Sequence, residues 1–357
     1  MSSTKKTELG QFYTDNHGYI LKSLWTNYIN GTIVEPFVGN GDLIKYVKEM
    51  GFEGNLELYD LDSEYPNCIK RDTLLNPPDY NNKWVITNPP YLARNKNKTK
   101  TIYDKYDIND LYKAFIINLI DGNVNGGIII IPLNFWSSIR ENDCSLRNNF
   151  LSKYQIEHLN IFEESVFSDT NYTVCSFVFR KKDIVLNSQD INTTIYPYNI
   201  NINLSVDRKC KWLFGGEIYN IIPNKKIKVA RLVENKENKG YFSTSILLHA
   251  IDSGTFDGKR ISLEPDNELF YGKESSRGQA TIISNIKLNE EQESILCEKF
   301  NEFFEEKREK THSLFLVNYR ESKEYARKRI PFNLAYLIIN KILSDMTSGN
   351  LLNITQT

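Results

Sequence analysis

Short β-branched runs alternate with stretches of helical periodicity through the first half of the chain. The runs predict buried strands, at Thr32–Val34, Leu56–Tyr59, Trp84–Thr87 and Ile128–Ile131. The stretches between them predict helices, at Leu43–Met50, Asp110–Ile120 and Ile139–Leu151. Two further strands are predicted near Ile156–Ile161 and Val174–Arg180. Strands joined by helices are typical of a parallel sheet covered on both faces, so we expect an α/β fold.

The pattern changes after Lys182. Residues 183–204 are rich in Asn, Ile and Tyr and show no clear helical period. Helical spacing of apolar positions returns at Asn289–Lys310 and again at Leu334–Leu343. We therefore predict two domains, residues 1–182 and residues 183–357, and expect the second to be α+β.

The composition is that of a globular protein. Of the 357 residues 40% are hydrophobic and 25% charged, and 44 Lys and Arg offset 45 Asp and Glu for a net charge of −1. No apolar run approaches the roughly 18 residues of a membrane span, and no apolar stretch follows the basic N-terminus as in a secretory signal. The balanced charge excludes a protein coated in basic residues, but it allows local basic patches.

Metal and disulfide chemistry find little support in the sequence. The five cysteines are scattered, odd in number and never arranged as C-x-x-C, and the four histidines lack close ligand spacing. This usage indicates reduced thiols in an intracellular, cytoplasmic protein, and we expect no metal site.

A rigid polar turn, Asn88-Pro89-Pro90-Tyr91, follows the predicted strand Trp84–Thr87. In a doubly wound sheet, ligands bind at the carboxyl ends of strands. The Asn88 oxygen and the Pro89 carbonyl can together accept both hydrogens of a planar amino group, and Tyr91 offers a ring for stacking. Such an arrangement favours attack by an exocyclic amine, because holding both hydrogens aligns the nitrogen. Taken alone, the four residues would also suit a polar-aromatic turn.

A glycine-containing turn follows the first predicted strand, in Glu35-Pro-Phe-Val-Gly-Asn-Gly41. Gly39 and Gly41 permit close approach of the backbone to a ligand, and Glu35 supplies a carboxylate at the strand end. The turn departs from the G-x-G-x-x-G dinucleotide fingerprint, and a tight structural turn explains it equally well.

Two acidic residues and a helix start complete the set of candidate groups. Asp60 ends the second predicted strand about 20 residues beyond the glycine turn, where a carboxylate can accept both hydroxyls of a ribose. Asp72 ends a third short strand and could accept a hydrogen bond from an adenine amino group. Each Asp alone is explained as well by a helix cap or a turn. Thr14 precedes a helical pattern through Leu24 and would cap that helix.

In this order the motifs resemble those of the S-adenosylmethionine-dependent DNA methyltransferases that modify amino groups, specifically the gamma-ordered adenine-N6 group. The resemblance covers roughly residues 10 to 180. It implies a catalytic tetrad, Asn88, Pro89, Pro90 and Tyr91. It implies cofactor contacts by Tyr13, Thr14, Glu35, Phe37, Gly39, Gly41, Asp60, Leu61, Asp72 and Thr73. The segment Gly10-Gln-Phe-Tyr-Thr14 resembles the N-terminal cofactor motif of that group. Asp15 stands where relatives commonly have Pro, which weakens the implied role of Thr14.

Two later segments extend this resemblance. Gly126–Phe135 resembles the strand and turn that follow the tetrad, and Val166–Arg180 resembles the strand that closes the sheet. Within the latter, Tyr172, or alternatively Phe167, would pack on the target base.

The resemblance also implies a fold and a reaction. The fold would be a Rossmann-like class I methyltransferase with a mixed seven-stranded sheet, followed by a C-terminal target-recognition domain. Adenine N6 would attack the sulfonium methyl group of S-adenosylmethionine after the base is flipped out of duplex DNA. Double-stranded DNA is the implied substrate, a cognate restriction endonuclease is an implied partner, and no metal is required.

The second half carries local basic clusters but no familiar DNA-binding pattern. Arg277 and Gln279, in a polar loop, are chemically suited to base edges, and Arg327 and Arg329 are suited to phosphates. The basic residues of Asn301–Lys310 are better explained as a solvated helix face, because neighbouring glutamates offset them.

Two alternatives stay open. A related enzyme could act on an RNA base or a protein glutamine amide, although such relatives usually carry their recognition domain before the cofactor loop. A non-catalytic nucleic-acid-binding relative would also keep the fold, although the intact tetrad and the paired glycines argue against it.

Overall fold

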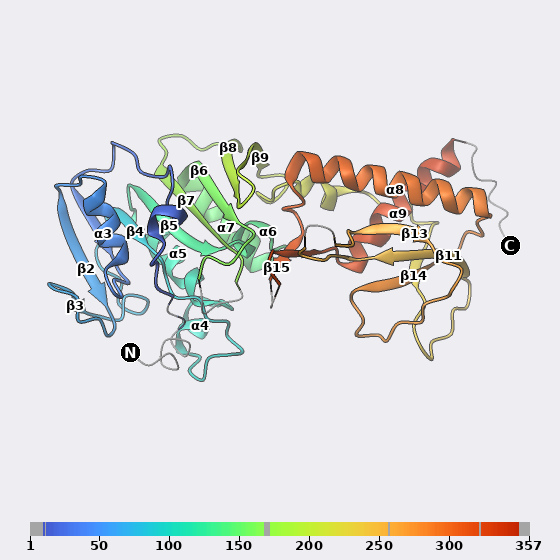
Figure 1. Cartoon of the computed structure of the whole chain (residues 1–357), viewed down its shortest axis with the longest axis horizontal. Coiled ribbons are helices and arrows are strands. Elements are labelled where there is room, and N and C mark those ends of the chain that lie inside the picture. The colour runs from blue at the N-terminus through green and yellow to red at the C-terminus, as the bar shows by residue number, and fades with distance from the viewer. Residues whose placement is uncertain (1–9, 11, 168–171, 256–257, 321–322, 350–357) are drawn as a thin grey trace. The chain divides into compact units, whose positions relative to one another are not determined.

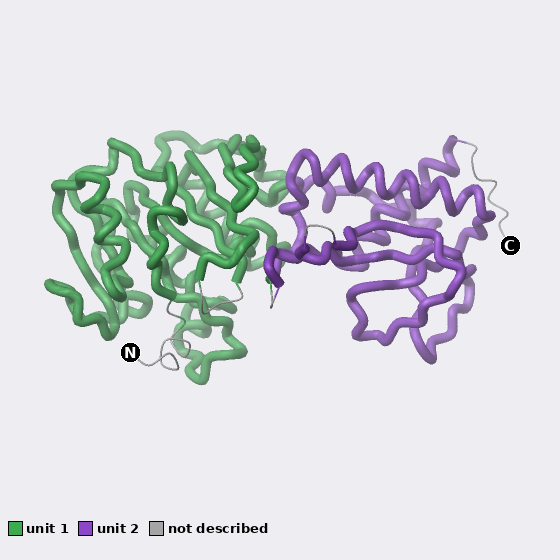
Figure 2. Tube along the Cα trace, in the orientation of Figure 1, with its two compact units in different colours: residues 1–214, 320–322 green, residues 215–319, 323–357 purple. Residues whose placement is uncertain are grey.

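The structure is a computed structural model, and it describes residues 10, 12–167, 172–255, 258–320 and 323–349. The chain divides into two compact units, residues 1–214 with 320–322 and residues 215–319 with 323–357 (Figure 2). This division lies later than the boundary expected at residue 182, because residues 183–214 continue the sheet of the first unit. Two parts of the predicted motifs, Gln11 and residues 168–171, lie outside the described residues.

A nine-stranded mixed sheet forms the first unit, with helices between its strands (Figure 1). Its strands are β1 (Thr32–Glu35), β2 (Asn55–Asp60), β3 (Ile69–Lys70), β4 (Trp84–Thr87), β5 (Gly126–Pro132), β6 (Tyr154–Phe162), β7 (Val174–Lys181), β8 (Ser188–Tyr196) and β9 (Ile200–Asp207). Its helices are α2 (His17–Ile20), α3 (Asp42–Glu49), α4 (Thr101–Tyr106), α5 (Leu111–Gly122), α6 (Asn134–Ser137) and α7 (Glu141–Lys153). The order across the sheet is β3-β2-β1-β4-β5-β7-β6-β8-β9.

The strand order reverses between β1 and β4, and this reversal determines where a ligand can bind. β1 runs parallel to both β2 and β4, and β4 runs parallel to β5. The crossover through α3 leads from β1 toward one edge of the sheet, and the crossover through α5 leads from β4 toward the other. Because such crossovers are right-handed, α3 and α5 cover opposite faces. The predicted α/β architecture is confirmed, and the crevice at the carboxyl ends of β1 and β4 is the expected ligand site.

The far side of the sheet contains the antiparallel strands. β7 runs antiparallel to β5 and β6, so the sheet is mixed, as the resemblance implied, although the alternation alone indicated a parallel sheet. β8 pairs in parallel with β6, and β9 pairs with β8 in antiparallel fashion, so nine strands replace the expected seven. The sequence does not predict β8 and β9, because Asn, Asp and Thr interrupt the apolar pattern that marks a buried strand such as β5.

The N-terminal helix is much shorter than predicted. α2 ends at Ile20, and its N-cap is Asn16 rather than Thr14. The Thr14 hydroxyl instead accepts a hydrogen bond from the Asn88 side chain at 3.2 Å. Leu24 is buried, but it lies outside any helix. The prediction of a helix through Leu24 with its cap at Thr14 was therefore wrong. Turns can bury apolar residues that recur at near-helical spacing, which is why the pattern suggested a longer helix.

The second unit is α+β, as expected. Its strands are β10 (Val229–Arg231), β11 (Phe242–His249), β12 (Ile251–Asp252), β13 (Ser262–Pro265), β14 (Gln279–Ser284), β15 (Val317–Tyr319) and β16 (Arg327–Arg329). They form a four-stranded sheet, β10-β14-β11-β13, and a three-stranded sheet, β12-β16-β15. A short 3₁₀ helix (Gly216–Asn220) precedes them. Helices α8 (Glu290–Thr311) and α9 (Phe332–Ser348) pack against the four-stranded sheet and share its core (Figure 1).

Helix α8 begins where the sequence predicts, and its first turn shows why. The Asn289 side chain accepts the Gln292 backbone N–H at 2.9 Å, and the Gln292 side chain accepts the Asn289 N–H at 3.0 Å. This reciprocal cap satisfies two backbone donors that the helix itself cannot pair.

Candidate active site

Hydrogen bonds to the backbone of Tyr59 and to the side chain of Asp60 hold the turn after β1 against the end of β2. The Val38 N–H donates to the Tyr59 carbonyl at 3.1 Å, and the Gly39 N–H donates to Asp60 Oδ2 at 3.0 Å. The other carboxylate oxygen, Asp60 Oδ1, accepts the Asp62 N–H at 2.8 Å. The predicted glycine turn and the predicted acidic strand end therefore form one structure at the point where the strand order reverses.

Both glycines of this turn have backbone conformations that favour glycine. Gly39 has φ +53° and Gly41 has φ +85°. A Cβ atom at Gly41 would lie 2.0 Å from the ring of Tyr65, and one at Gly39 would lie 3.0 Å from the ring of Tyr13. Steric fit explains Gly41, which packs away from the cavity described below, whereas Gly39 lines that cavity.

Glu35 is buried beneath the turn rather than exposed to a ligand. Its side chain is 1% exposed, and Oε1 accepts the Thr87 hydroxyl at 2.6 Å and the Phe37 N–H at 3.0 Å. The other oxygen, Oε2, is buried without a hydrogen-bond partner. Burial raises the pKa of Glu35 to about 8, and the nearby charge of Asp60 adds to the effect, so the side chain is largely protonated at pH 7.

The Asn88 side chain is held in one orientation at the carboxyl end of β4. Its Nδ2 donates to the Phe12 carbonyl at 2.8 Å and to the Thr14 hydroxyl at 3.2 Å. The Tyr91 hydroxyl donates to Asn88 Oδ1 and also lies 3.1 Å from the Ile130 carbonyl. These contacts tie the tetrad to the N-terminal segment on one side and to β5 on the other.

Tyr91 does not present an open ring face to the cavity. Its side chain is 1% exposed, and its ring stacks on Phe12 with centroids 5.3 Å apart. The Tyr172 ring meets the Tyr91 ring edge-on at 5.8 Å, and the Phe167 ring lies 6.2 Å from that of Phe12. Tyr172 and its alternative Phe167 therefore both belong to the aromatic cluster around the tetrad.

Asp72 and Thr73, which follow β3, are the next predicted cofactor contacts. Asp72 Oδ1 accepts the backbone N–H groups of Leu74 and Leu75, each at 3.1 Å, so this carboxylate also caps a turn. The Thr73 hydroxyl donates to the Pro36 carbonyl at 3.0 Å and fixes the segment to the glycine turn.

A cavity of about 240 Å³ opens where these segments meet. The predicted residues that line it are Tyr13, Phe37, Gly39, Asp60, Leu61, Asp72, Thr73, Asn88 and Pro90. The predicted residues outside its lining are Thr14, Glu35, Gly41, Pro89 and Tyr91. Residues that sequence reasoning missed are Phe12, Arg71, Leu74, Asn97, Thr99, Ile102 and Leu111. Of these, Phe12 lies inside a recognised motif, whereas the loop with Asn97 and Thr99 carries no periodic signal.

In the second unit, two of the four predicted DNA contacts come together. Arg277 and Arg329 line a hollow of about 300 Å³ at the start of α9, together with Arg231. The other two predicted residues, Gln279 and Arg327, make contacts inside the second unit. Gln279 Nε2 lies 3.1 Å from His249 Nδ1, and the Arg327 guanidinium lies 5.3 Å from the centre of the Tyr319 ring.

Other basic residues of this unit are engaged in internal pairs. Lys307 pairs with Glu217 at 2.7 Å, and Arg308 pairs with Asp252 at 3.1 Å. Both basic side chains are only 15% exposed, so they lie in internal ion pairs rather than on the solvated helix face expected for α8. Lys328, between the two candidate arginines of β16, is buried and donates to the His312 carbonyl at 2.7 Å.

Among the residues that the structure describes, no group of three or more His, Cys, Asp or Glu side chains could hold a metal ion. In the same stretches of the chain, every helix is too short or too polar to cross a membrane. The five cysteines, all of them among the described residues, form no disulfide with one another.

Residues 79–167 match the family model described as Eco57I restriction-modification methylase. The matched stretch includes the tetrad Asn88–Tyr91 and extends from before β4 to beyond β6. No curated protein matches the chain.

The solved structures that match are distant. A modification subunit of a putative type I restriction enzyme from Vibrio vulnificus is 14% identical, with a TM-score of 0.39 over 54% of this chain and 48% of that one. A putative class I S-adenosylmethionine-dependent methyltransferase from Listeria monocytogenes is 14% identical, with a TM-score of 0.40 over 52% and 66%. A type I restriction-modification methyltransferase subunit from Streptococcus thermophilus is 16% identical, with a TM-score of 0.40 over 54% and 50%. The chain thus spans about half of two of these structures and about two thirds of the third.

Proposed function

We propose that this protein is a site-specific DNA methyltransferase that transfers a methyl group from S-adenosylmethionine to N6 of an adenine flipped out of duplex DNA. The observation that carries the proposal is the shared cavity, which Asn88 and Pro90 line together with Asp60 and Asp72. Asn88, a proposed acceptor for a planar amine, and two carboxylates suited to a nucleoside thus line one volume. The family match over residues 79–167 supports the same class of reaction, because it includes the tetrad.

The cavity residues fit an adenosyl cofactor by their chemistry. Asp60 and Asp72 retain lone pairs beyond the backbone N–H groups that they accept, which suits ribose hydroxyls and an adenine amino group. Phe37 and Leu61 supply apolar surface beside them. Glu35 Oε2 is buried without a hydrogen-bond partner. A cationic ligand bound nearby would favour the ionised form of this carboxyl. When bound, S-adenosylmethionine supplies an activated methyl group.

Asn88 is the residue that we propose to hold the target amine. Its Nδ2 is occupied by Phe12 and Thr14, so the orientation of the amide is fixed before substrate binds. Its Oδ1 accepts from Tyr91 and retains a second lone pair. Together with the Pro89 carbonyl, this oxygen can accept both hydrogens of the adenine amino group. That contact aligns the nitrogen lone pair and stabilises positive charge as the new bond forms.

The second unit is proposed to recognise the DNA, with the arginine-lined hollow as a phosphate contact. Arg231 is pre-organised there, because it donates to the Ser276 and Glu274 carbonyls at 2.7 Å each, and its guanidinium lies 4.4 Å from the centre of the Phe332 ring. Arg277 and Arg329 line the same hollow. Gln279, suited to base edges, and Arg327, suited to phosphates, belong to the same proposal.

One experiment tests both the reaction and the substrate. The purified protein is incubated with labelled S-adenosylmethionine and unmethylated plasmid, and modified bases are located by methylation-aware sequencing. The proposal predicts label in DNA at adenines within one recognition sequence. Label in RNA or protein, with none in DNA, would overturn it and favour the amide- or RNA-modifying alternative.

A further inference from the structure

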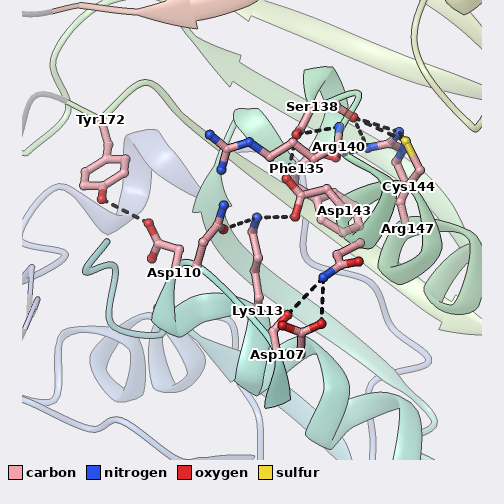
Figure 3. A network of polar contacts seen from close by, with 12 residues as sticks. Asp107, Asp110, Lys113, Phe135, Ser138, Arg140, Asp143, Cys144, Arg147 and Tyr172 are labelled. Carbon is pink, nitrogen blue, oxygen red and sulfur yellow. Dashed lines mark hydrogen bonds and ion pairs between the residues drawn. The ribbon is translucent and has the colours of Figure 1, made fainter. Parts of the chain in front are cut away.

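Asp110 begins helix α5, yet its side chain does not cap that helix. It has the extended backbone of an N-cap residue, φ −151° and ψ 144°, without a side-chain capping hydrogen bond. An aspartate in this position ordinarily accepts an N–H from the first turn of its own helix. Here Oδ1 accepts the Leu92 N–H and Oδ2 accepts the Tyr172 hydroxyl, each at 3.0 Å (Figure 3 shows the second contact).

Both partners of Asp110 lie beside the proposed catalytic turn. Leu92 directly follows Tyr91, and the strand-like contact between Ala93 and Asp110 continues with the Arg94 N–H donating to the Asn109 carbonyl at 2.9 Å. Tyr172 meets the Tyr91 ring edge-on at 5.8 Å. One carboxylate therefore links the segment that leaves the tetrad to the tyrosine packed against it.

The link depends on the buried carboxylate of Asp110, although a neutral side chain would be enough to cap helix α5. Asp110 is 8% exposed, and burying a carboxylate is costly unless its oxygens are hydrogen-bonded. Serine would cap α5 without that cost, but serine could not accept hydrogen bonds from Leu92 and Tyr172 through two separate oxygens. The two contacts account for the carboxylate better than helix capping does.

We infer that Asp110 is a positioning residue that ties Tyr172 to the Asn88–Tyr91 turn and so holds the tyrosine ring as a wall of the pocket for the target adenine. The inference rests on the proposed function, since it assigns Tyr172 to that base. Neither Asp110 nor Tyr172 lines the proposed cofactor cavity, so the tether should affect turnover and leave cofactor binding unchanged.

The protonation state of Asp110 gives the tether a signature in the pH profile. Burial raises the pKa of Asp110 to about 6, against the opposing effects of the Tyr172 hydrogen bond and the Lys113 charge. The titratable groups that interact with it are Lys113, Tyr91, Tyr103, Tyr112 and Tyr172. Burial raises the pKa values of these tyrosines, which moves them further from pH 6, and burial lowers the pKa of Lys113. Below that pH the protonated carboxyl has lost one acceptor.

Three substitutions separate the tether from the ring and from the charge. Tyr172→Phe keeps the ring and removes the hydroxyl, and Asp110→Ala removes both contacts. We expect each to lower kcat on unmethylated plasmid about 10- to 100-fold, because small misplacements of a reacting group cost that much. The KM for S-adenosylmethionine should stay at the wild-type value in both.

Asp110→Asn mimics the protonated carboxyl at every pH and removes the titration. Its amide oxygen can accept the Leu92 N–H, but its amide nitrogen cannot accept the Tyr172 hydroxyl. Its kcat at pH 7.5 should therefore fall to the level that the wild type reaches below pH 6. The acid limb near pH 6 in the wild-type kcat profile should disappear in this variant.

Tyr28→Phe is the matched control, because the Tyr28 hydroxyl also donates to a carboxylate, that of Glu157, away from the cavity lining. It should leave kcat unchanged. Wild-type kcat in Tyr172→Phe, or an acid limb that persists in Asp110→Asn, would overturn the inference while the proposed function stands. A wild-type protein that methylates no DNA would overturn the proposed function and this inference with it.

Discussion

Glu35 offers the sharpest physical test of the first unit, because a single buried carboxyl should govern how its stability depends on pH. Burial raises the pKa of Glu35 from its ordinary value of 4.5 to about 8. A raised pKa means that the folded protein holds this proton more tightly than the unfolded chain does. The resulting stabilisation is fully present below pH 4.5 and is lost as the pH rises through about 8.

The size of the effect follows from that shift. Each pKa unit corresponds to about 1.4 kcal/mol, so the unfolding free energy should fall by roughly 5 kcal/mol between the two pH limits. Glu35→Gln removes the titration with little change of shape. Its amide oxygen can still accept the Thr87 hydroxyl and the Phe37 N–H, and its nitrogen replaces the unpartnered Oε2.

The assay is urea unfolding of the wild type and Glu35→Gln at intervals from pH 5 to pH 9. All four tryptophans, Trp25, Trp84, Trp136 and Trp212, lie in the first unit, so tryptophan fluorescence follows the unit that contains Glu35. Subtracting the two curves cancels the other titrating groups. The wild type should lose stability relative to the variant as the pH rises to about 8. A difference that stays constant over this range would refute the buried, protonated state of Glu35.

Two further predictions concern other charged groups. Asp143→Ala should lower the unfolding free energy by about 3 kcal/mol, because it leaves the buried ammonium of Lys113 without its ion-pair partner. Replacing both residues by apolar ones should lower it less, and thermal unfolding of the two variants measures the difference. Arg277→Ala combined with Arg329→Ala should reduce the slope of log affinity against log salt for duplex DNA by about 2, as measured by fluorescence anisotropy. Arg260→Ala, whose arginine pairs with Glu305 at 3.6 Å, is the control and should change the slope less, and equal slopes in all three proteins would contradict the proposed phosphate contact.

The parts of the fold that could be predicted are those whose pattern is set by burial on both faces. Every residue of β4 and β5 is buried, and both appear in the sequence as continuous apolar runs. β8 could not be predicted in the same way, because Asn192 and Asp190 are exposed and break the run. Its place in the sheet depends on pairing with β6, far away in sequence, which no local pattern reveals.

The candidate site divides along the same physical line. Asp60 and Asn88 could be placed because strand ends in a doubly wound sheet converge at one edge. Phe12 was missed because its segment has no regular secondary structure, so nothing local indicates that its ring covers Tyr91. The sequence could not predict that Arg277 and Arg329 line one hollow, because this depends on how β16 and the segment before β14 are arranged in the second unit.

The central claim is that Asn88 holds an adenine amino group for methylation. The most direct measurement is mass spectrometry of nucleosides from unmethylated DNA that has been incubated with S-adenosylmethionine and either the wild type or Asn88→Ala. We expect N6-methyladenine with the wild type and at least ~100-fold less with Asn88→Ala, while cofactor binding stays unchanged. A methylated cytosine in place of methyladenine, or equal N6-methyladenine from both proteins, would contradict it.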